Sequence, residues 1–224
     1  MIGDVPGSAI VAGGKAPEQG AFEASMDVSV VDVLFELSGT LVPADCAAAL
    51  ALAVTAELPW FGAESRAGIH PLRGAPSTHG TLVLARRARL MVRVPAARAS
   101  ATLALSGRGL DLGGEPVTVG AGHLRALAPS ATLFAQRVAS GSCDERAFHD
   151  DVVRWLAELG VRCEFISGRA RSVGAGGREV AGYSLALHGL GPADSLRVQA
   201  EGLGGERRLG FGIFVPHKAI ATFA

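Results

Sequence analysis

The chain contains 224 residues, 49% of them hydrophobic, and its 21 basic and 21 acidic residues give a formal net charge of zero. This length allows one domain or two modules of roughly 100 residues each. No segment approaches the roughly 20 uncharged apolar residues of a membrane span, so no membrane helix is predicted.

The three cysteines, Cys46, Cys143 and Cys163, lie far apart in the sequence and form no CxxC pair. This pattern argues against a disulfide framework and against a zinc site, and a reducing cytoplasm is the expected location. Residues 1–27 contain a single Lys and no apolar segment that ends in a cleavage site. They do not resemble a secretory signal and are predicted to form a flexible tail.

The first predicted module comprises residues 28–122. Over 28–37, alternate residues are apolar at the period of a half-buried strand; they are Val31, Val33, Phe35 and Leu37, alternating with Asp32, Leu34 and Glu36. Leu and Val at four-residue spacing predict a helix between Pro43 and Pro59. Residues 59–80 are rich in Pro, Gly and Ser, which predicts a long irregular loop.

Two apolar runs after this loop, 81–85 and 90–94, predict a hairpin with Arg89 and Arg93 on one exposed face. A short helix through Leu105 and a strand over 116–119 complete the order βαββαβ.

The second predicted module, residues 123–224, repeats this order. Its first helix starts at Ser142-Cys143-Asp144-Glu145, which has the form of a capping box. The predicted strands cover 131–138, 161–166, 180–187 and 209–215, with a basic turn over 169–177 and a second helix from Pro192. The predicted fold class is α+β, with two tandem ferredoxin-like (RRM-like) modules.

Positive charge is concentrated in two regions despite the neutral total. Residues 60–110 hold eight Arg and a single acid, Glu64, and residues 161–224 hold eight basic and five acidic residues. Nineteen of the 21 basic residues are Arg, whose planar guanidinium suits phosphate contacts and base stacking. This zoning favours a nucleic-acid partner, and a genomic preference for Arg and Ala is the alternative explanation.

The most distinctive segment is Gly-Leu-Gly-Gly-Glu-Arg-Arg-Leu-Gly-Phe-Gly at 202–212. Closely spaced glycines let backbone N–H groups approach a phosphate chain, and neighbouring arginines supply charge. The residues concerned are Gly202, Gly204, Gly205, Arg207, Arg208, Gly210 and Gly212. As spacing alone this is weak evidence for RNA binding, because most glycines in a chain mark turns.

With its continuation Ile213-Phe214-Val215-Pro216-His217-Lys218, the segment resembles the terminal glycine-rich loop and last strand of the CRISPR repeat endoribonucleases of the Cas6 family, especially the MYXAN subtype. Leu58-Pro59-Trp60 and Gly68-Ile69-His70-Pro71 are similar to that subtype too, and the resemblance extends from about residue 29 to 220. It implies two ferredoxin-like modules, which agrees with the periodicity, and cleavage of precursor CRISPR RNA within each repeat. The expected partners are repeat RNA, mature guide RNA and other subunits of a surveillance complex, with no membrane.

The resemblance also implies chemistry without a metal or another cofactor. A ribose 2′-hydroxyl attacks the neighbouring phosphorus, a base takes its proton, and an acid protonates the departing 5′-oxygen. Histidine suits both roles because its ordinary pKa is about 6.5. His70 lies where family members with a catalytic histidine place it, and we expect it to be catalytic. Lys218 is expected to stabilise the transition state, and the alternative is a basic residue of the C-terminal tail without a catalytic role.

His79, in the same loop as His70, is the runner-up. The only tyrosine, Tyr183, lies in the second module, which leaves the partner of His70 open. The remaining residues expected to bind RNA are arginines that flank His70 or belong to the predicted hairpins. They are Arg66, Arg73, Arg86, Arg87, Arg89, Arg93, Arg169 and Arg171.

Two other functions fit the same sequence features. One is a non-catalytic RNA-binding subunit of a CRISPR surveillance complex, which would use the same arginines. The other is a duplicated ferredoxin-like module that binds a small ligand or a protein. The sequence contains no P-loop, H-E-x-x-H or G-x-S-x-G motif, so nucleotide hydrolysis, zinc chemistry and esterase activity have little support.

Overall fold

The computed structural model describes three ranges of the chain, residues 29–77, 80–141 and 144–218. Several sequence predictions fall outside these described residues: the flexible tail over 1–27, His79, and the Ser142-Cys143 part of the capping box. Within the described ranges, no helix is long and apolar enough to cross a membrane.

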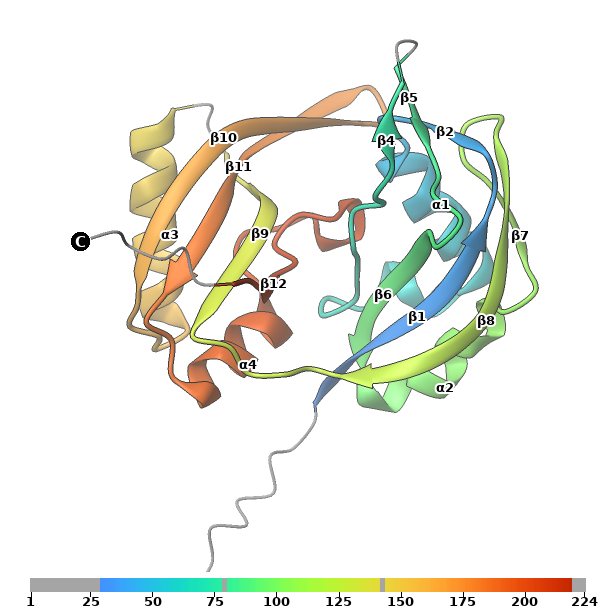
Figure 1. The fold of residues 1–224 in the computed structure, drawn as a ribbon. Coiled ribbons are helices and arrows are strands. Elements are labelled where there is room, and N and C mark those ends of the chain that lie inside the picture. The colour runs from blue at the N-terminus through green and yellow to red at the C-terminus, as the bar shows by residue number, and fades with distance from the viewer. Residues whose placement is uncertain (1–28, 78–79, 142–143, 219–224) are drawn as a thin grey trace, which may run out of the picture.

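The first half of the chain is a ferredoxin-like module built on an antiparallel sheet in the order β3-β6-β1-β8-β7 (Figure 1). The strands of this sheet are β1 (Val30–Ser38), β3 (Gly68–Ile69), β6 (Arg89–Pro95), β7 (Gly109–Asp111) and β8 (Pro116–Ala126). The helices are α1 (Ala47–Glu57) and α2 (Ala99–Thr102), with 3-10 turns η1 (Pro59–Gly62), η2 (Ala96–Arg98) and η3 (Leu103–Leu105). A smaller sheet contains β2 (Leu41–Pro43), β5 (Thr81–Val83) and β4 (Ala75–Pro76).

The predicted hairpin of 81–85 with 90–94 is wrong. β5 pairs with β2 and β4, whereas β6 pairs with β1 and β3, so the two apolar runs lie in different sheets. The second strand of the ferredoxin-like order is instead β3, which lies inside the predicted irregular loop. It is only two residues long, and such a length carries no periodic pattern. His70 follows β3 directly.

The first strand is confirmed as β1, but its predicted half-burial is wrong near its start. Asp32 and Leu34, on the face opposite Val33 and Phe35, are each only 1% exposed. The second module packs against this part of the sheet, so both faces of the strand are covered.

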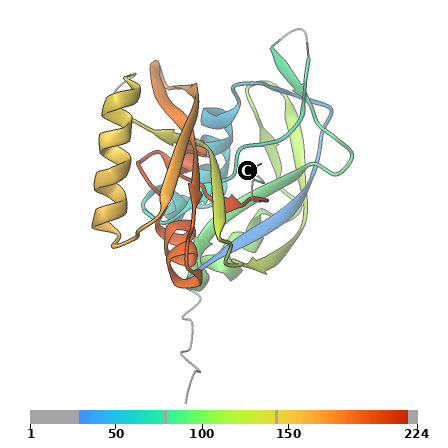
Figure 2. The ribbon, with the colours of Figure 1, turned by 60° about the vertical axis from the view of Figure 1, so that its left-hand side comes forward.

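The second half is also ferredoxin-like, with strands in the order β10-β11-β9-β12. Its elements are β9 (Thr132–Ala139), α3 (Glu145–Glu158), β10 (Glu164–Ala175), β11 (Arg178–His188), α4 (Pro192–Glu201), η4 (Arg207–Leu209) and β12 (Val215–Pro216). The Asp144 carboxylate caps α3 by accepting hydrogen bonds from the backbone N–H groups of Arg146 and Ala147. Figure 2 shows α3 on the side of this sheet that faces away from the first module.

Three predicted element boundaries differ from the structure, two in the second module and one at the end of the first. The basic turn expected over 169–177 is mostly strand, because β10 continues to Ala175 and the chain turns at 176–177. The last strand, expected over 209–215, is reduced to β12. β8 continues to Ala126, beyond the strand end predicted at residue 119.

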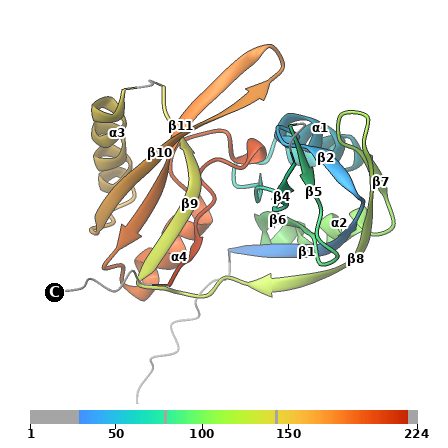
Figure 3. The same ribbon diagram turned by 45° about the horizontal axis from the view of Figure 1, so that its top comes forward.

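The β10–β11 hairpin connects the two modules on one side. Figures 1 and 3 show this hairpin extending from its own sheet towards α1. The backbone N–H of Gly174 donates a hydrogen bond to the Asp45 carboxylate at 2.8 Å, just before α1. Val173 and Val180 of the hairpin pack with Phe211 in an apolar cluster that also contacts α1.

Arg93, on β6, connects the modules from within. Its guanidinium donates two hydrogen bonds to the Asp32 carboxylate, from Nε at 2.8 Å and from Nη2 at 3.2 Å. Its Nη1 donates to the carbonyl oxygens of Gln199 at 2.9 Å and Phe214 at 2.7 Å, both in the second module. One side chain that is 1% exposed therefore fixes α4 and the approach to β12 against the first sheet.

We expect Arg93→Met to lower the free energy of unfolding by about 3–5 kcal/mol, because it leaves the Asp32 carboxylate buried without its main partner. Arg89→Met is the matched control, since Arg89 is an exposed arginine on the same strand and its loss should change the free energy by no more than about 0.5 kcal/mol. Urea unfolding of both variants measures the difference. Equal values would show that the buried pair does not stabilise the module junction.

Candidate active site

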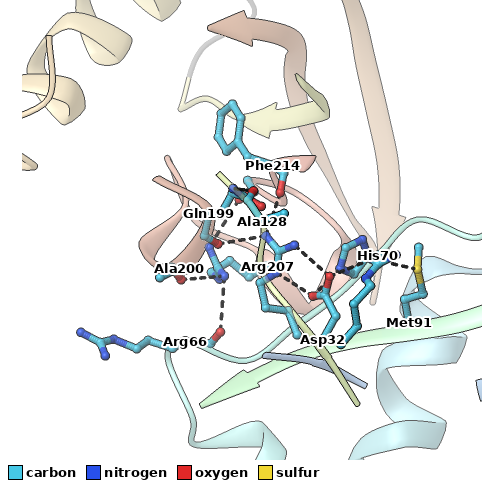
Figure 4. Close-up of polar contacts among 12 residues, drawn as sticks. Asp32, Arg66, His70, Met91, Ala128, Gln199, Ala200, Arg207 and Phe214 are labelled. Atoms are coloured by element: carbon cyan, nitrogen blue, oxygen red, sulfur yellow. Dashed lines mark hydrogen bonds and ion pairs between the residues drawn. The ribbon is translucent and has the colours of Figure 1, made fainter. Parts of the chain in front are cut away.

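The side chain at the centre of the candidate site is the Asp32 carboxylate, on β1. His70 Nε2 lies 3.0 Å from Asp32 Oδ1, which is also the oxygen bonded by Arg93 Nε. Arg125, on the neighbouring strand β8, donates from Nη2 to Asp32 Oδ2 at 3.0 Å. Figure 4 shows His70 beside Asp32, with Gln199 and Phe214 of the second module nearby. His70 is 4% exposed, so its ring is fixed in a buried network.

This network determines the charge state of both acid–base groups. Burial alone would raise the pKa of Asp32, but the hydrogen bond with His70 and the charge of Arg93 outweigh it and hold that pKa well below its ordinary value. Burial lowers the pKa of His70, the hydrogen bond and charge of Asp32 oppose this shift, and the charges of Arg93 and Arg125 add to it. The site therefore favours a carboxylate beside a neutral imidazole at neutral pH.

His70 lines a cavity of about 270 Å³ between the modules, which we call the His70 pocket. Three arginines share its wall: Arg137 from β9, Arg171 from β10 and Arg208 from η4. The guanidinium of Arg137 lies over the Phe211 ring at 5.2 Å from the ring centroid, and its Nε donates to the Gly210 carbonyl at 3.4 Å. The three arginines are suited to bind a phosphodiester, and the neutral imidazole is suited to remove a proton from a group beside it.

A second cavity lies on the other side of Asp32. It has a volume of about 530 Å³ and is lined by four arginines besides the buried Arg93. These four, Arg73, Arg87, Arg89 and Arg125, form what we call the arginine groove. Asp32 lines this groove while its Oδ1 contacts His70, so one carboxylate lies between the groove and the His70 pocket.

The glycine-rich segment is folded into the protein. The N–H groups of Gly202, Gly210 and Gly212 donate to the carbonyls of Val198, Arg207 and Arg137, which contradicts the expectation that these amides face a phosphate chain. Gly212 has a φ of 64°, and a side chain there would collide with the Leu203 carbonyl oxygen. Gly204 is half-buried, and Gly205 is the exposed member of the set.

The two arginines of this segment have different positions. Arg207 is 7% exposed and donates to the carbonyls of Ala200, Gly212 and Arg66, so it is not placed to contact RNA. Burial lowers its pKa to about 10, which leaves it charged near neutral pH. Arg208 is exposed, donates to the Gly62 carbonyl at 2.5 Å and lines the His70 pocket. Of the two arginines in this segment, only Arg208 therefore adds charge to the pocket.

The other predicted residues are scattered. Arg93 is buried, which contradicts the expectation of an exposed arginine on a hairpin face. Arg86 and Arg169 are exposed and line neither cavity, and Arg66 forms an ion pair with Glu201 at 2.6 Å. Lys218 is exposed beyond β12 and does not line the His70 pocket.

Sequence reasoning missed Asp32, Arg125 and Arg137. An acidic residue inside the apolar run Val30–Phe35 is a signal that identifies Asp32, whereas Arg125 and Arg137 carry no local signal because their positions depend on strand pairing. Among the described residues, no group of three or more His, Cys, Asp or Glu side chains is arranged to hold a metal ion.

The lowered pKa of His70 predicts how stability depends on pH. The unfolded chain takes up the proton more readily, so the stabilising contribution is complete above about pH 6.5 and is lost as the pH falls below that value. We expect the stability difference between wild type and His70→Gln, measured by urea unfolding, to shrink from pH 7 to pH 5. A difference that stays constant or grows would mean that the folded protein does not disfavour protonated His70.

Comparison with known proteins identifies the family. Residues 31–219 match the family model for Cas6 Crispr. A CRISPR-associated endonuclease Cas6 from Myxococcus xanthus (strain DK1622) is 38% identical over 187 residues, covering 83% of this chain and 81% of that protein. Two solved structures share the fold at 12% identity: a RAMP protein that binds different RNA substrates (TM-score 0.60, covering 84% of this chain and 100% of that one) and a Cas6-related protein from Pyrococcus furiosus (TM-score 0.57, 86% and 99%). Because the family model spans most of the sequence and the Myxococcus relative covers four fifths of it, the chain belongs to the Cas6 family.

Proposed function

We propose that this protein is a CRISPR-associated endoribonuclease that cleaves precursor CRISPR RNA within its repeats, and that the His70 pocket is its active site. The observation that supports this most strongly is the position of His70. A neutral imidazole bonded to a buried carboxylate lies in a cavity lined by three arginines. The family membership of the chain and the endonuclease name of its Myxococcus relative support the same activity.

The proposed reaction is an intramolecular transfer at phosphorus. His70 takes the proton from a ribose 2′-hydroxyl, and the oxygen forms a bond to the adjacent phosphorus. The bond from phosphorus to the 5′-oxygen breaks, and that oxygen takes up a proton as it leaves. The products are a 2′,3′-cyclic phosphate and a 5′-hydroxyl, and the step requires no added reactant.

The arginines of the His70 pocket take the charge-stabilising role that sequence reasoning assigned to Lys218. Negative charge accumulates on the phosphorus oxygens during the attack, and prearranged cations lower its free energy. Arg137 is the best held of the three, because it packs on Phe211 and donates to Gly210. Arg171 and Arg208 are exposed and are placed to accompany the flanking phosphates.

The arginine groove is the proposed path for the RNA backbone beside the active site. Arg73, Arg87, Arg89 and Arg125 supply positive charge there without a matching set of acids, since Asp32 is already paired within the protein. Mature guide RNA would remain bound by the same contacts. We place the protein in the cytoplasm and expect other subunits of a CRISPR surveillance complex as further partners.

The deep burial of His70 favours one alternative, a non-catalytic RNA-binding subunit that uses the same arginines. In that case Asp32–His70 would be a purely structural pair. RNA cleavage distinguishes the two functions directly.

We expect His70→Ala to slow cleavage of the protein's own repeat RNA by about 10²-fold or more, as for loss of a general base, with binding retained. His149→Ala is the control, since His149 is an exposed histidine on α3, away from the pocket. Single-turnover cleavage and binding of a substrate with a 2′-deoxy scissile nucleotide measure the two properties.

In the same assay, EDTA should leave the wild-type rate unchanged, because the 2′-hydroxyl reaction needs no metal. A His70→Ala protein that cuts at the wild-type rate would remove the proposed active site. Loss of wild-type activity on chelation would point to a metal-dependent reaction.

We expect Arg87→Ala combined with Arg89→Ala to weaken repeat-RNA binding and to reduce the dependence of log Kd on log salt by roughly one unit for each lost phosphate contact. Arg154→Ala with Arg197→Ala, two arginines remote from both cavities, is the charge-matched control. Fluorescence titrations at several salt concentrations measure both slopes. Equal slopes for the groove variant and wild type would show that the arginine groove does not hold RNA.

A further inference from the structure

We infer that Asp32 is a positioning residue for the cleavage reaction: it holds His70 in the tautomer with the proton on Nε2, so that Nδ1 is the nitrogen that accepts the 2′-hydroxyl proton. This inference rests on the proposed function of His70 and goes beyond it by naming the reacting nitrogen and the group that selects it.

The first step concerns the protonation of Asp32. Its two oxygens accept three hydrogen bonds from guanidinium groups: Oδ1 from Arg93 Nε at 2.8 Å, and Oδ2 from Arg93 Nη2 at 3.2 Å and Arg125 Nη2 at 3.0 Å. Guanidinium groups donate and do not accept, and two of these cations contact both oxygens, which strongly favours the ionised carboxylate over the protonated acid. Asp32 is therefore an acceptor only.

The second step concerns His70. Its Nε2 lies 3.0 Å from Asp32 Oδ1, and an acceptor-only oxygen at that distance requires the hydrogen on Nε2. A neutral imidazole carries a single ring hydrogen, so Nδ1 keeps its lone pair. The backbone also fixes the residue, because the His70 N–H donates to the Met91 carbonyl at 2.9 Å on the adjacent strand.

The third step concerns rigidity. A positioning residue acts only if it is itself immobile, and Asp32 is 1% exposed and held by Arg93, whose remaining donors bind two carbonyls of the second module. The orientation of the His70 ring therefore depends on contacts that form when the two modules pack together. Once Nδ1 has taken a proton, the adjacent carboxylate stabilises the imidazolium.

Asp32→Asn is the informative variant, because it keeps the size of the side chain but makes one of the two positions an amide donor. With the amide at Oδ2, two guanidinium donors would face it. With the amide at Oδ1, Arg93 Nε faces it, and His70 can accept from it by moving its own proton to Nδ1. The amide at the Oδ1 position faces one guanidinium donor instead of two, so we expect this placement. The His70 ring then carries its hydrogen on Nδ1, and Nδ1 cannot accept the proton of the 2′-hydroxyl.

The first measurement is the tautomer in the intact wild-type protein. With ¹⁵N-labelled histidine and the His70 signals assigned by their loss in His70→Gln, we expect a protonated Nε2 and an unprotonated Nδ1 at neutral pH. The opposite tautomer, or an imidazolium, would overturn the inference. This result does not depend on activity, so it stands even if Asp32→Asn fails to fold.

The second measurement is cleavage by folded Asp32→Asn. We expect kcat to fall by about 10²-fold or more with binding of the 2′-deoxy substrate within about threefold of wild type, and a His70 spectrum with hydrogen on Nδ1. Asp151→Asn, which removes a surface carboxylate paired with Arg154 on α3, is the control and should cut at the wild-type rate. Wild-type kcat in Asp32→Asn, while His70→Ala is inactive, would overturn the inference and leave the proposed function intact. An inactive wild type, or an active His70→Ala, would instead remove the proposed function.

Discussion

The structure depends on the buried ion pair between Asp32 and Arg93. A buried charge pair is favourable only when its geometry is complete and its remaining donors are satisfied. Here Arg93 binds both carboxylate oxygens, and its Nη1 donates to two carbonyls of the second module. The ion pair itself lies within the first module, on the paired strands β1 and β6. The bonds from Arg93 Nη1 to Gln199 and Phe214 form only when the second module is docked, so they help to specify how the two modules face each other. Residues of both modules line the His70 pocket and the arginine groove, so the shape of each cavity depends on this arrangement.

The Asp32 carboxylate lies between the two cavities and contacts a side chain of each. On one side, Asp32 contacts the His70 ring that we propose carries out proton transfer, and on the other it binds Arg125, which is half exposed in the groove. RNA phosphates that engage Arg125 would compete with Asp32 for its guanidinium. Arg93 keeps the carboxylate in place during such an exchange, since it is buried and makes both contacts from the same strand face. In the proposed reaction, the orientation of His70 would therefore not depend on whether Arg125 contacts the RNA.

Much of the fold could be predicted from the sequence, because periodicity and capping residues act locally. β1, α1, α3 and α4 follow directly from such patterns. β3 could not be found, since two residues contain no period, and the hairpin error at 81–94 followed from it. The burial of Asp32 and Arg93 could not be predicted from the sequence for a different reason. The alternation of apolar and polar residues along β1 shows only which face packs on the core of its own module. The opposite face is covered by the second module, through residues as far along the chain as Gln199 and Phe214.

The glycine-rich segment shows why a correctly located motif can be assigned the wrong physical role. Its glycines permit close backbone approach, as the spacing indicates, but at Gly202 and Gly212 the neighbours are the Arg207 guanidinium and the Leu203 carbonyl. The segment closes tightly over Arg207, whose donors bind carbonyls on both sides of the module junction. This closure places η4 beside β3, so that Arg208 and the Gly210 carbonyl, which holds Arg137, lie next to His70. The glycines thus serve the proposed active site indirectly. They allow the chain to pack closely enough to bring cations to His70, and in the proposed reaction these side chains, not the glycine amides, contact the phosphate.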